Sequence, residues 1–390
     1  MQQGYKQTEI GVIPETWEVK ELKGIAPLQR GFDLPYSQMK DGPYPVVFSN
    51  GVAAYHAQYM VKGPGVVTGR SGTIGKVHYV GENYWPHNTS LWVTNFYGNY
   101  PKYIYYLLNT INWELYNSGS GVPTLNRNDI HDLKCAIPSV EEQKYIAEAL
   151  SDVDGMISSL EKLITKKKAV KQGAMQDLLT CKKRLPGFTG EWEGYTIGKM
   201  GEFYSGLSGK SKKDFDCGEA YYITFLNVLS NVKIDTSILA SVDVRENESQ
   251  NAVRKGDLFF NTSSETPEEV GMCAVLDEEL ENTYLNSFCF GFRLFDDTHD
   301  PLFLSYYLNS AIGRKIMSVL AQGATRYNLS KNNFAETVIK LPVKEEQTAI
   351  ASILSDMDNE IETLEQKLTK ARQIKQGMMQ QLLTGKIRLV

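Results

Sequence analysis

Residues 206–213, GLSGKSKK, end like a phosphate-binding loop and are the first stretch that suggests catalytic chemistry. Such a loop needs a glycine five residues before its Gly-Lys-Ser, because its backbone amides wrap the phosphates. Tyr204 stands there instead, and the nearest glycine, Gly206, lies only three residues before Gly209. The run GRSGTIG (69–75) precedes VHYV, which reads as a strand, so a tight turn between strands is expected. Neither run predicts a nucleotide site.

Other kinds of chemistry lack their residues. No Asn-Pro-Pro-aromatic motif of an adenine methyltransferase occurs, and Asp132-Leu133-Lys134 has no partner acidic motif for a nuclease. No Ser/His/Asp set has local support. The five cysteines and five histidines are scattered, and an odd cysteine count without CxxC favours reduced thiols in a cytoplasmic protein. We therefore expect no catalytic residues, no metal site and no cofactor in this chain.

Length and composition point to a folded protein of two or three domains. The chain has 390 residues, 42% of them hydrophobic and 22% charged. No run of about 18 apolar residues suggests a membrane span, and the N-terminus lacks the pattern of a signal peptide. The formal net charge of −5 argues against a nucleic-acid partner if it is averaged over the chain.

The chain contains an internal duplication. Residues 137–186 and 341–390 align without gaps at an offset of 204, with 26 identities in 50 positions. Weaker similarity extends to the lead-in segments at the start of the two variable domains, 13–26 and 187–201. Trp17 in the first lead-in matches Trp192 in the second. This repeat predicts four segments: a variable domain at 1–140, a helix at 141–184, a variable domain at 185–344 and a helix at 345–390. Because the second copy ends where the first continues into a lead-in, we expect the C-terminus to lie near the N-terminus.

Both shared segments are predicted to be long helices. Each begins after a proline (Pro138, Pro342) with paired glutamates that suit a helix N-terminus, and about 40 residues would give a rod of roughly 60 Å. The apolar residues recur at alternating spacings of four and three, which indicates a coiled-coil seam. The predicted seam consists of Ile146, Leu150, Val153, Ile157, Leu160 and Ile164 in the first copy and Ile350, Leu354, Met357, Ile361, Leu364 and Leu368 in the second.

Charge predicts how the two helices pair. Residues 141–161 carry a net −5 and 162–184 carry +7, while 345–364 carry −6 and 365–388 carry +5. Parallel helices would align like charges, whereas antiparallel helices would align each acidic half with a basic half. The helix dipole explains the gradient of charge but not the two apolar seams. We therefore expect an intramolecular antiparallel coiled coil.

These features resemble the DNA specificity subunit of type I restriction–modification systems. The resemblance rests on the paired PxxxEEQxxIAxxLSDxD…KQGxMQxLLTxK segments, the proline–tryptophan lead-ins and the two divergent globular regions. The runs VTGRSGTIGKV (67–77) and KGDLFFNTSSETPEEVG (255–271) also look like that family's target-recognition domains. The resemblance covers essentially the whole chain.

The resemblance implies an α+β fold with two target-recognition domains, each joined to the next by a long helix in a pseudo-two-fold, cyclic arrangement. Each domain would read one half of a bipartite double-stranded DNA site, and the antiparallel helices would set the gap between the half-sites. Two methyltransferase subunits would dock on this chain, and motor–nuclease subunits would join them. S-adenosylmethionine, ATP and magnesium would belong to those partners, so the chain itself would be a non-catalytic specificity subunit.

Polar loops between strands are the expected DNA contacts, because arginine, asparagine and glutamine can form paired hydrogen bonds to bases while lysine, serine and threonine suit phosphates. Glu265 could accept from the amine of a cytosine. The candidates are Arg70, Ser71, Thr73, Lys76, Asn88, Thr89, Asn126 and Arg127 in the first domain and Asn261, Thr262, Ser263, Ser264, Glu265, Arg326, Tyr327, Asn328 and Lys331 in the second.

Plainer interpretations stay open for these features. Clusters of glycine, serine, threonine and asparagine occur in any turn. The lysines Lys166, Lys167 and Lys168 could approach DNA, but we favour an orientation toward the acidic half of the partner helix or toward solvent. The coiled coil could also serve only as an assembly scaffold, without DNA readout by this chain, and a self-contained methyltransferase would have to bind S-adenosylmethionine alone.

The distribution of charge along the chain removes the objection that the net charge of −5 argues against a nucleic-acid partner. The net charge is +1 for residues 1–140, +2 for 141–184, −7 for 185–344 and −1 for 345–390. Most of the acidity lies in 265–300, which hold ten acids and one base. We therefore expect the isolated chain to bind DNA weakly and the partner subunits to neutralise much of the phosphate charge. The target bases and the gap length do not follow from the sequence.

Overall fold

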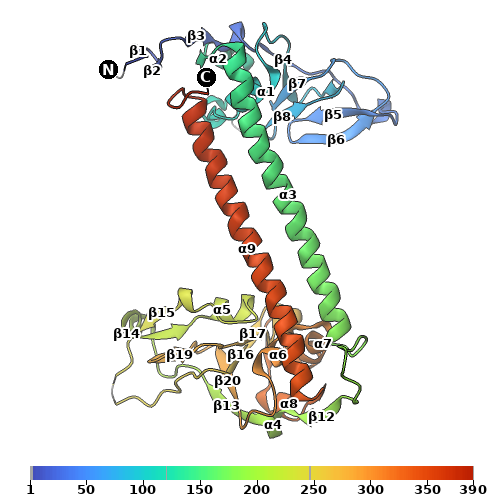
Figure 1. Ribbon diagram of the computed structural model, residues 1–390, viewed down its shortest axis with the longest axis vertical. Helices are drawn as coiled ribbons and strands as arrows, with labels where there is room; N and C mark the ends of the chain where they lie inside the picture. The colour runs from blue at the N-terminus through green and yellow to red at the C-terminus, as the bar shows by residue number, and fades with distance from the viewer. Residues whose placement is uncertain (1–2, 120, 246, 390) are drawn as a thin grey trace. The chain divides into compact units, whose positions relative to one another are not determined.

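The computed structural model describes residues 3–119, 121–245 and 247–389, which fold into two compact units (Figure 1). Unit 1 comprises Met1–Lys162 with Glu365–Val390, and unit 2 comprises Leu163–Leu364. The units cut across the predicted helical segments, because each long helix contributes one half to each unit. The fold is α+β, and no helix among the described residues is both long and apolar enough to span a membrane.

The N-terminal part of unit 1 is built mainly of short strands and leads into the first long helix, α3, whose first half belongs to this unit. The elements are β1 (Tyr5–Thr8), β2 (Gly11–Pro14), β3 (Glu18–Glu21), β4 (Leu28–Arg30), β5 (Tyr44–Phe48), β6 (Gly51–His56), β7 (Gly65–Gly69), β8 (Val77–Val80), β9 (Trp85–Pro86), β10 (Ser90–Val93), α1 (Pro101–Leu108), α2 (Arg127–His131), β11 (Lys134–Ile137) and α3 (Val140–Leu178).

Unit 2 repeats this plan with longer insertions and leads into the second long helix, α9, whose first half belongs to this unit. The elements are β12 (Glu193–Thr196), α4 (Ile197–Met200), β13 (Gly201–Ser205), β14 (Phe215–Ile223), α5 (Phe225–Ser230), β15 (Ala240–Val242), β16 (Leu258–Asn261), β17 (Ser263–Ser264), β18 (Cys273–Val275), β19 (Thr283–Leu285), β20 (Cys289–Leu294), α6 (Pro301–Asn309), α7 (Ala311–Leu320), β21 (Ala321–Gln322), β22 (Tyr327–Leu329), α8 (Lys331–Ala335), β23 (Val338–Leu341) and α9 (Lys344–Leu382).

The two units share one sheet topology. A four-stranded sheet has the order β4-β10-β7-β8 in unit 1 and β13-β20-β16-β18 in unit 2. A second sheet contains a parallel pair in each unit, β5 with β9 and β14 with β19. A third pair joins the lead-in strand to the strand before the long helix, β3 with β11 and β12 with β23. The divergent regions therefore share a framework although their sequences differ.

Two equivalent glycines fix this framework where backbone segments approach closely. A Cβ on Gly31 would lie 2.2 Å from the carbonyl oxygen of His87, and a Cβ on Gly206 would lie 2.1 Å from that of Asn286. No side chain fits at either distance, so both copies need glycine here. The predicted turn at 69–75 is confirmed, because it links β7 to β8.

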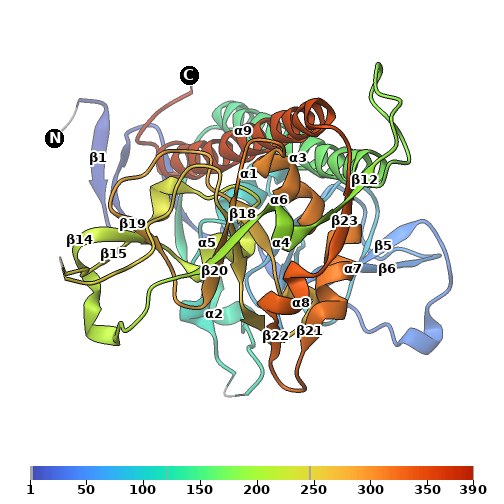
Figure 2. The same ribbon diagram turned by 90° about the horizontal axis from the view of Figure 1, so that it is seen from below.

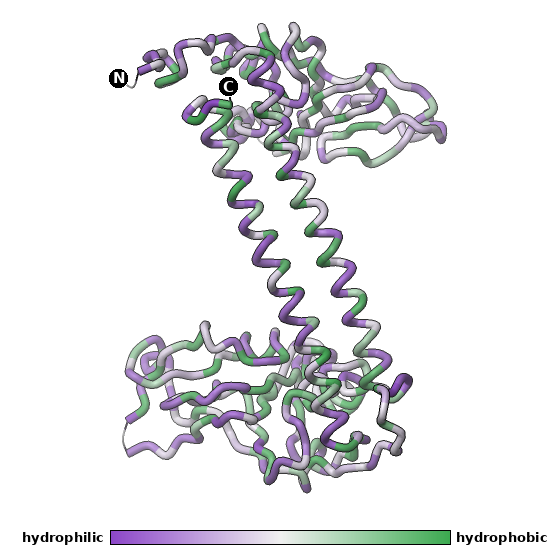
Figure 3. The backbone as a smooth tube through the Cα atoms, in the orientation of Figure 1, coloured by the Kyte–Doolittle hydropathy of each residue, from purple (hydrophilic) through white to green (hydrophobic). Residues whose placement is uncertain are grey.

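Each unit has its own apolar core, to which the long helices contribute. In unit 1, Ile146 and Leu150 of α3 pack with Leu382 of α9 and with the buried Trp17. In unit 2, Figure 2 shows α6 between α9 and the four-stranded sheet, and Leu354 packs there in the core. Figure 3 shows hydrophobic and hydrophilic residues alternating along both long helices, as amphipathic helices require.

The predicted seam residues are all removed from solvent to some degree. Buried side chains are Ile146, Leu150, Ile164, Ile350, Leu354, Ile361 and Leu364. Half-buried side chains are Val153, Ile157, Leu160, Met357 and Leu368. The first turns of each seam therefore pack into a domain core, and Ile164, Ile361 and Leu364 show that buried seam residues also occur near the middle of the helices.

Ion pairs within each unit establish that α3 and α9 run antiparallel. In unit 1, Arg372 lies 2.7 Å from Glu161, and in unit 2, Lys167 lies 2.7 Å from Glu360. Within unit 1, Asp154 of α3 pairs with Lys375 of α9, and Glu161, further along α3, pairs with Arg372, which comes earlier on α9; only an antiparallel pair produces this order. The prediction from charge is confirmed, and Lys167 faces the acidic half of the partner helix as we favoured.

Segments near the two ends of the chain meet in unit 1, as the repeat predicted. The Tyr5 hydroxyl donates to the carbonyl oxygen of Gly385 at 3.0 Å. Arg388 forms a two-pronged ion pair with the buried Glu142, which also accepts from the indole N–H of Trp17 at 3.0 Å. The lead-in, the start of α3 and the segment after α9 therefore converge on one carboxylate.

Candidate nucleic-acid interface

Three loops at strand ends meet in unit 1; they span 70–76, 87–89 and 122–127. The Arg70 backbone N–H donates to the Thr89 carbonyl at 2.9 Å, and the Arg70 carbonyl accepts from the Leu125 N–H at 2.8 Å. The Gly72 N–H donates to the Pro123 carbonyl at 3.0 Å. Polar residues that are far apart in sequence thus form one continuous surface of backbone-linked loops.

The same arrangement occurs in unit 2; its loops span 262–266, 286–288 and 326–331. The Thr262 N–H donates to the Phe288 carbonyl, and the Thr262 carbonyl accepts from the Leu329 N–H, both at 2.9 Å. Ser263 pairs with Asn328 in the β17–β22 ladder, as Ser71 forms a bridge to Thr124 in unit 1. The two units hold equivalent loops on equivalent hydrogen bonds.

The loops of the two units have the same backbone arrangement but carry different side chains. Thr262 occupies in unit 2 the place of Arg70, and Phe288 occupies the place of Thr89, because each pair makes the same main-chain hydrogen bonds. Asn126 and Ser330 each cap the N-terminus of the following short helix. Further equivalent pairs are Asn88 with Ser287, Thr124 with Asn328 and Arg127 with Lys331. A constant frame with exchanged side chains suits a surface that reads different ligands in its two copies.

Most predicted contact residues reach the surface at least in part. These are Arg70, Ser71, Thr73, Lys76, Asn88, Thr89, Asn126, Arg127, Thr262, Ser264, Glu265, Arg326, Tyr327, Asn328 and Lys331. Within the described part of the chain, the side chains of Arg70 and Arg127 make no hydrogen bond or ion pair. Their guanidinium groups are therefore open to a ligand.

Several of these side chains already have partners within unit 1. The Asn88 amide donates to the carboxylate of Asp33, and the Lys76 ammonium donates to the Asn50 carbonyl at 3.1 Å. The Thr89 hydroxyl lies 3.0 Å from Nδ1 of His87. Burial lowers the pKa of His87, so this ring is neutral at pH 7. These contacts orient the loops, and a ligand would have to share or displace them.

Two candidates in unit 2 need correction, since Asn261 and Ser263 are buried. Asn261 is 0% exposed, and its amide donates to the Glu269 carbonyl at 2.8 Å while its oxygen accepts from the Met272 N–H at 2.7 Å. The Ser263 hydroxyl accepts from Nε of Arg326 at 3.2 Å. Both side chains hold the loop together, so we no longer expect them to contact DNA.

Sequence reasoning missed the third loop of unit 2. Phe288 is 61% exposed although large aromatic side chains are usually buried, and Ser287 beside it is also exposed. The signal was present, because Asn286-Ser287-Phe288 precedes a buried strand in the same way that His87-Asn88-Thr89 does. Phe288 is thus an additional candidate for an apolar contact, for example with a thymine methyl group.

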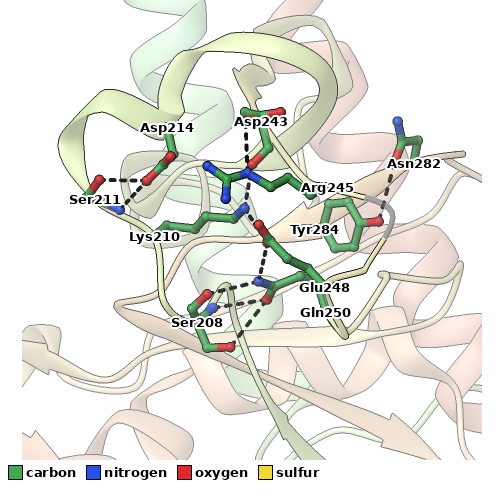
Figure 4. Close-up of polar contacts among 10 residues, drawn as sticks. All are labelled: Ser208, Lys210, Ser211, Asp214, Asp243, Arg245, Glu248, Gln250, Asn282 and Tyr284. Carbon is green, nitrogen blue, oxygen red and sulfur yellow. Dashed lines mark hydrogen bonds and ion pairs between the residues drawn. The ribbon is translucent and has the colours of Figure 1, made fainter.

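The lysine of the phosphate-loop-like run is engaged elsewhere (Figure 4). The Lys210 side chain is only 4% exposed; it is paired with Glu248 and donates to the Asp243 carbonyl at 2.5 Å. The hydrogen bond from Lys210 holds the pKa of Glu248 below its usual value. Ser211 and Asp214 form a capping box at the next turn. Lys210 therefore stabilises a loop, and its ammonium is not available to a phosphate.

Other reactive groups also have structural surroundings. Burial raises the pKa of the Cys135 thiol to about 11 and that of Cys289 to about 12, so both are protonated and unreactive at pH 7. Among residues 3–119, 121–245 and 247–389, no group of three or more His, Cys, Asp or Glu side chains is placed to hold a metal ion.

Comparisons with known proteins all point to the same protein family. The model of the type I restriction modification DNA specificity domain matches residues 14–172 and again 189–373. The MjaX specificity subunit, assigned to a type I restriction enzyme of Methanocaldococcus jannaschii, is 27% identical over 428 residues, which span 100% of this chain and 97% of that protein.

Solved structures share the fold. The S subunit of a type I restriction–modification system from M. genitalium superposes with a TM-score of 0.65 at 16% identity, covering 98% of this chain and 99% of that one. A chain from a structure of a type I restriction–modification complex, described for its assembly and conformational transition, gives a TM-score of 0.54 at 14% identity, covering 96% and 99%.

Proposed function

We propose, from the premise that this chain belongs to the family of type I restriction–modification DNA specificity subunits, that it recognises a bipartite DNA sequence. Each globular region, 1–140 and 185–344, acts as a target-recognition domain that reads one half-site. The loops that meet in each unit provide the contacts. The chain supplies specificity to a complex whose other subunits carry out the chemistry.

The observation that carries this proposal is the duplicated loop frame with exchanged side chains. A protein that only assembled partners would have no need of two equivalent surfaces that differ in their hydrogen-bonding groups. Arg70 and Thr262 occupy equivalent backbone positions in the two units, and so do Thr89 and Phe288. The two members of each pair would select different bases. Two recognition surfaces with the same geometry but different side chains would recognise two different half-sites.

The remaining subunits follow from the two-fold plan. We place one methyltransferase subunit on each equivalent half, with the helices α3 and α9 as shared docking and spacing elements, and motor–nuclease subunits on that core. S-adenosylmethionine, ATP and magnesium would be bound by those partners, and the chain itself would be non-catalytic. The complex would act in the cytoplasm, where its DNA is.

Mapping of methylated bases in DNA from cells that carry the complete system would test this function. The expected result is one sequence of two unlike half-sites separated by a fixed number of unspecified bases. Deleting this chain should abolish methylation at all such sites. Methylation that persisted at the same sites without the chain would contradict the proposal, and a complex that formed without any sequence preference would favour the scaffold interpretation.

Replacing Arg70 by alanine is expected to weaken specific DNA binding by about 1–3 kcal/mol and to relax one position of the first half-site, because a two-pronged contact to a guanine would be lost. Arg326→Ala should act in the same way on the second half-site. Binding of the assembled complex to native and singly mismatched DNA measures both effects.

The matched control for these variants is Arg372→Ala, which removes an arginine from the helix pair and leaves the loops intact. Its effect on mismatch discrimination should be negligible. Unchanged affinity and unchanged site preference in both loop variants would refute the assignment of the loops.

A further inference from the structure

A buried tyrosine of α1 contacts both long helices at one point in unit 1. The Tyr106 hydroxyl donates to Oδ2 of Asp154 on α3 at 2.7 Å. The other oxygen, Oδ1, lies 2.7 Å from Nζ of Lys375 on α9. The Lys375 ammonium also lies 5.9 Å from the centre of the Tyr106 ring, within the range of a cation–π interaction. Three elements are thus joined through one carboxylate.

The same contact occurs in unit 2 with the roles of the long helices exchanged. The Tyr306 hydroxyl of α6 donates to Oδ2 of Asp358 on α9 at 2.6 Å. Oδ1 of Asp358 is paired with Lys171 on α3, whose ammonium lies 5.5 Å from the centre of the Tyr306 ring. We call these two groups joints: Tyr106–Asp154–Lys375 in unit 1 and Tyr306–Asp358–Lys171 in unit 2. Each joint takes its aspartate from one copy of the duplicated segment and its lysine from the other.

These joints differ in kind from the rest of the domain–helix contact. Apolar packing such as that of Ile146 and Leu150 is non-directional and tolerates small rotations. The tyrosine hydroxyl, carboxylate and ammonium are directional and charge-assisted, so they fix an angle as well as a distance. Burial and the neighbouring carboxylates raise the pKa values of Tyr106 and Tyr306, so both hydroxyls keep the proton they donate.

We propose that Tyr106, Asp154 and Lys375, with their counterparts Tyr306, Asp358 and Lys171, are positioning residues that hold each recognition domain at one orientation on the helix pair. They would thereby restrict the gap between half-sites that the complex accepts. This inference rests on the proposed function. The residues touch no DNA and act only by orienting the loops that do.

The joint in unit 1 can be altered without leaving a sealed polar group behind. Tyr106 and Asp154 line an open hollow of about 460 Å³ together with Lys102 and Tyr105, so water can reach the groups that a substitution frees. Tyr106→Phe keeps the ring and its packing and removes only the hydroxyl. The variant should therefore fold, and its effect should be on orientation.

The test is methylation by the assembled complex of DNAs with native half-sites and gaps one or two base pairs shorter or longer than the native gap. We expect Tyr106→Phe/Tyr306→Phe to raise the rate at the altered gaps, relative to the native gap, by about tenfold, the size expected for the loss of hydrogen bonds to charged groups. The preferred bases of each half-site should stay the same. Arg372→Ala and Lys167→Ala, which remove ion pairs between the helices alone, should leave the gap preference unchanged.

Hydrogen exchange of the chain in its complex without DNA separates this inference from the function it rests on. Amides of α1 and α6 should exchange faster in the double tyrosine variant, whatever the DNA specificity is. Unchanged exchange, or faster exchange with a gap preference as narrow as that of the unaltered protein, would overturn the role of the joints. If the unaltered complex showed no sequence preference in its methylation, that result would instead refute the proposed function.

Discussion

Arg388→Ala is expected to lower the free energy of unfolding of unit 1 by about 3 kcal/mol, because it leaves a buried carboxylate without its cation. The Glu142 side chain is 2% exposed, and Nη2 of Arg388 donates to its Oε2 at 2.7 Å. After the substitution, the indole N–H of Trp17 would be the remaining side-chain donor to that carboxylate among the residues that the structure describes. One hydrogen bond cannot replace the solvation that the carboxylate gave up on burial.

A second substitution distinguishes this explanation from a loss of packing. Adding Glu142→Gln to Arg388→Ala should restore most of the lost stability, because the buried group becomes neutral and can still accept from Trp17. If packing of the arginine stem were the cause, the double variant would be as unstable as the single one. Urea unfolding followed by tryptophan fluorescence measures both.

Unit 2 provides an internal comparison. Glu346 is 0% exposed and is paired with Arg184, whose Nη2 lies 2.6 Å from its Oε2. Among the described residues, the indole N–H of Trp192 makes no hydrogen bond, in contrast to that of its counterpart Trp17. Arg184→Ala should therefore cost unit 2 at least as much, while Lys167→Ala, which breaks an exposed pair, should cost less than about 1 kcal/mol.

The long helices and their pairing could be predicted because the information is local and repeated. The spacing of apolar residues defines each seam, and the opposite charge of the two halves selects the antiparallel direction, as the pairs Lys167–Glu360 and Arg372–Glu161 demonstrate. The framework of the variable domains was harder to recognise. Its strands are short, and its sheet order joins strands that are distant in sequence.

Single residues of the interface could not be assigned because composition does not determine orientation. Asn261 and Thr262 are neighbours with similar turn preferences, yet only the second reaches the surface. Tyr106 was indistinguishable from an ordinary core tyrosine, since its partner Asp154 follows 48 residues later and Lys375 much later still. Such contacts depend on the packing of three elements, which no local pattern records.

Inserting seven residues into each long helix, after Lys162 and after the equivalent Gln366, is expected to lengthen the preferred gap between half-sites by about three base pairs. Seven residues add about 10 Å to a helix, and a base pair occupies about 3.4 Å of DNA. A block of seven also preserves the heptad phase, so the seam continues through the insertion. Methylation of DNAs with a graded series of gaps measures the shift, and the native gap should become a poor substrate.

The insertion must be made in both helices, and this requirement supplies its control. A block in α3 alone would displace Lys171 from Asp358 along the partner helix, so the single variant should lose stability and methylation at every gap. Three added base pairs also turn one half-site by about 100° relative to the other, because DNA turns once in about 10.5 base pairs. The supercoil of the inserted heptad compensates little of this rotation, so the new optimum should be methylated more slowly than the native site is by the unaltered complex. A double variant that folds and keeps the native gap would show that α3 and α9 join the domains without measuring distance.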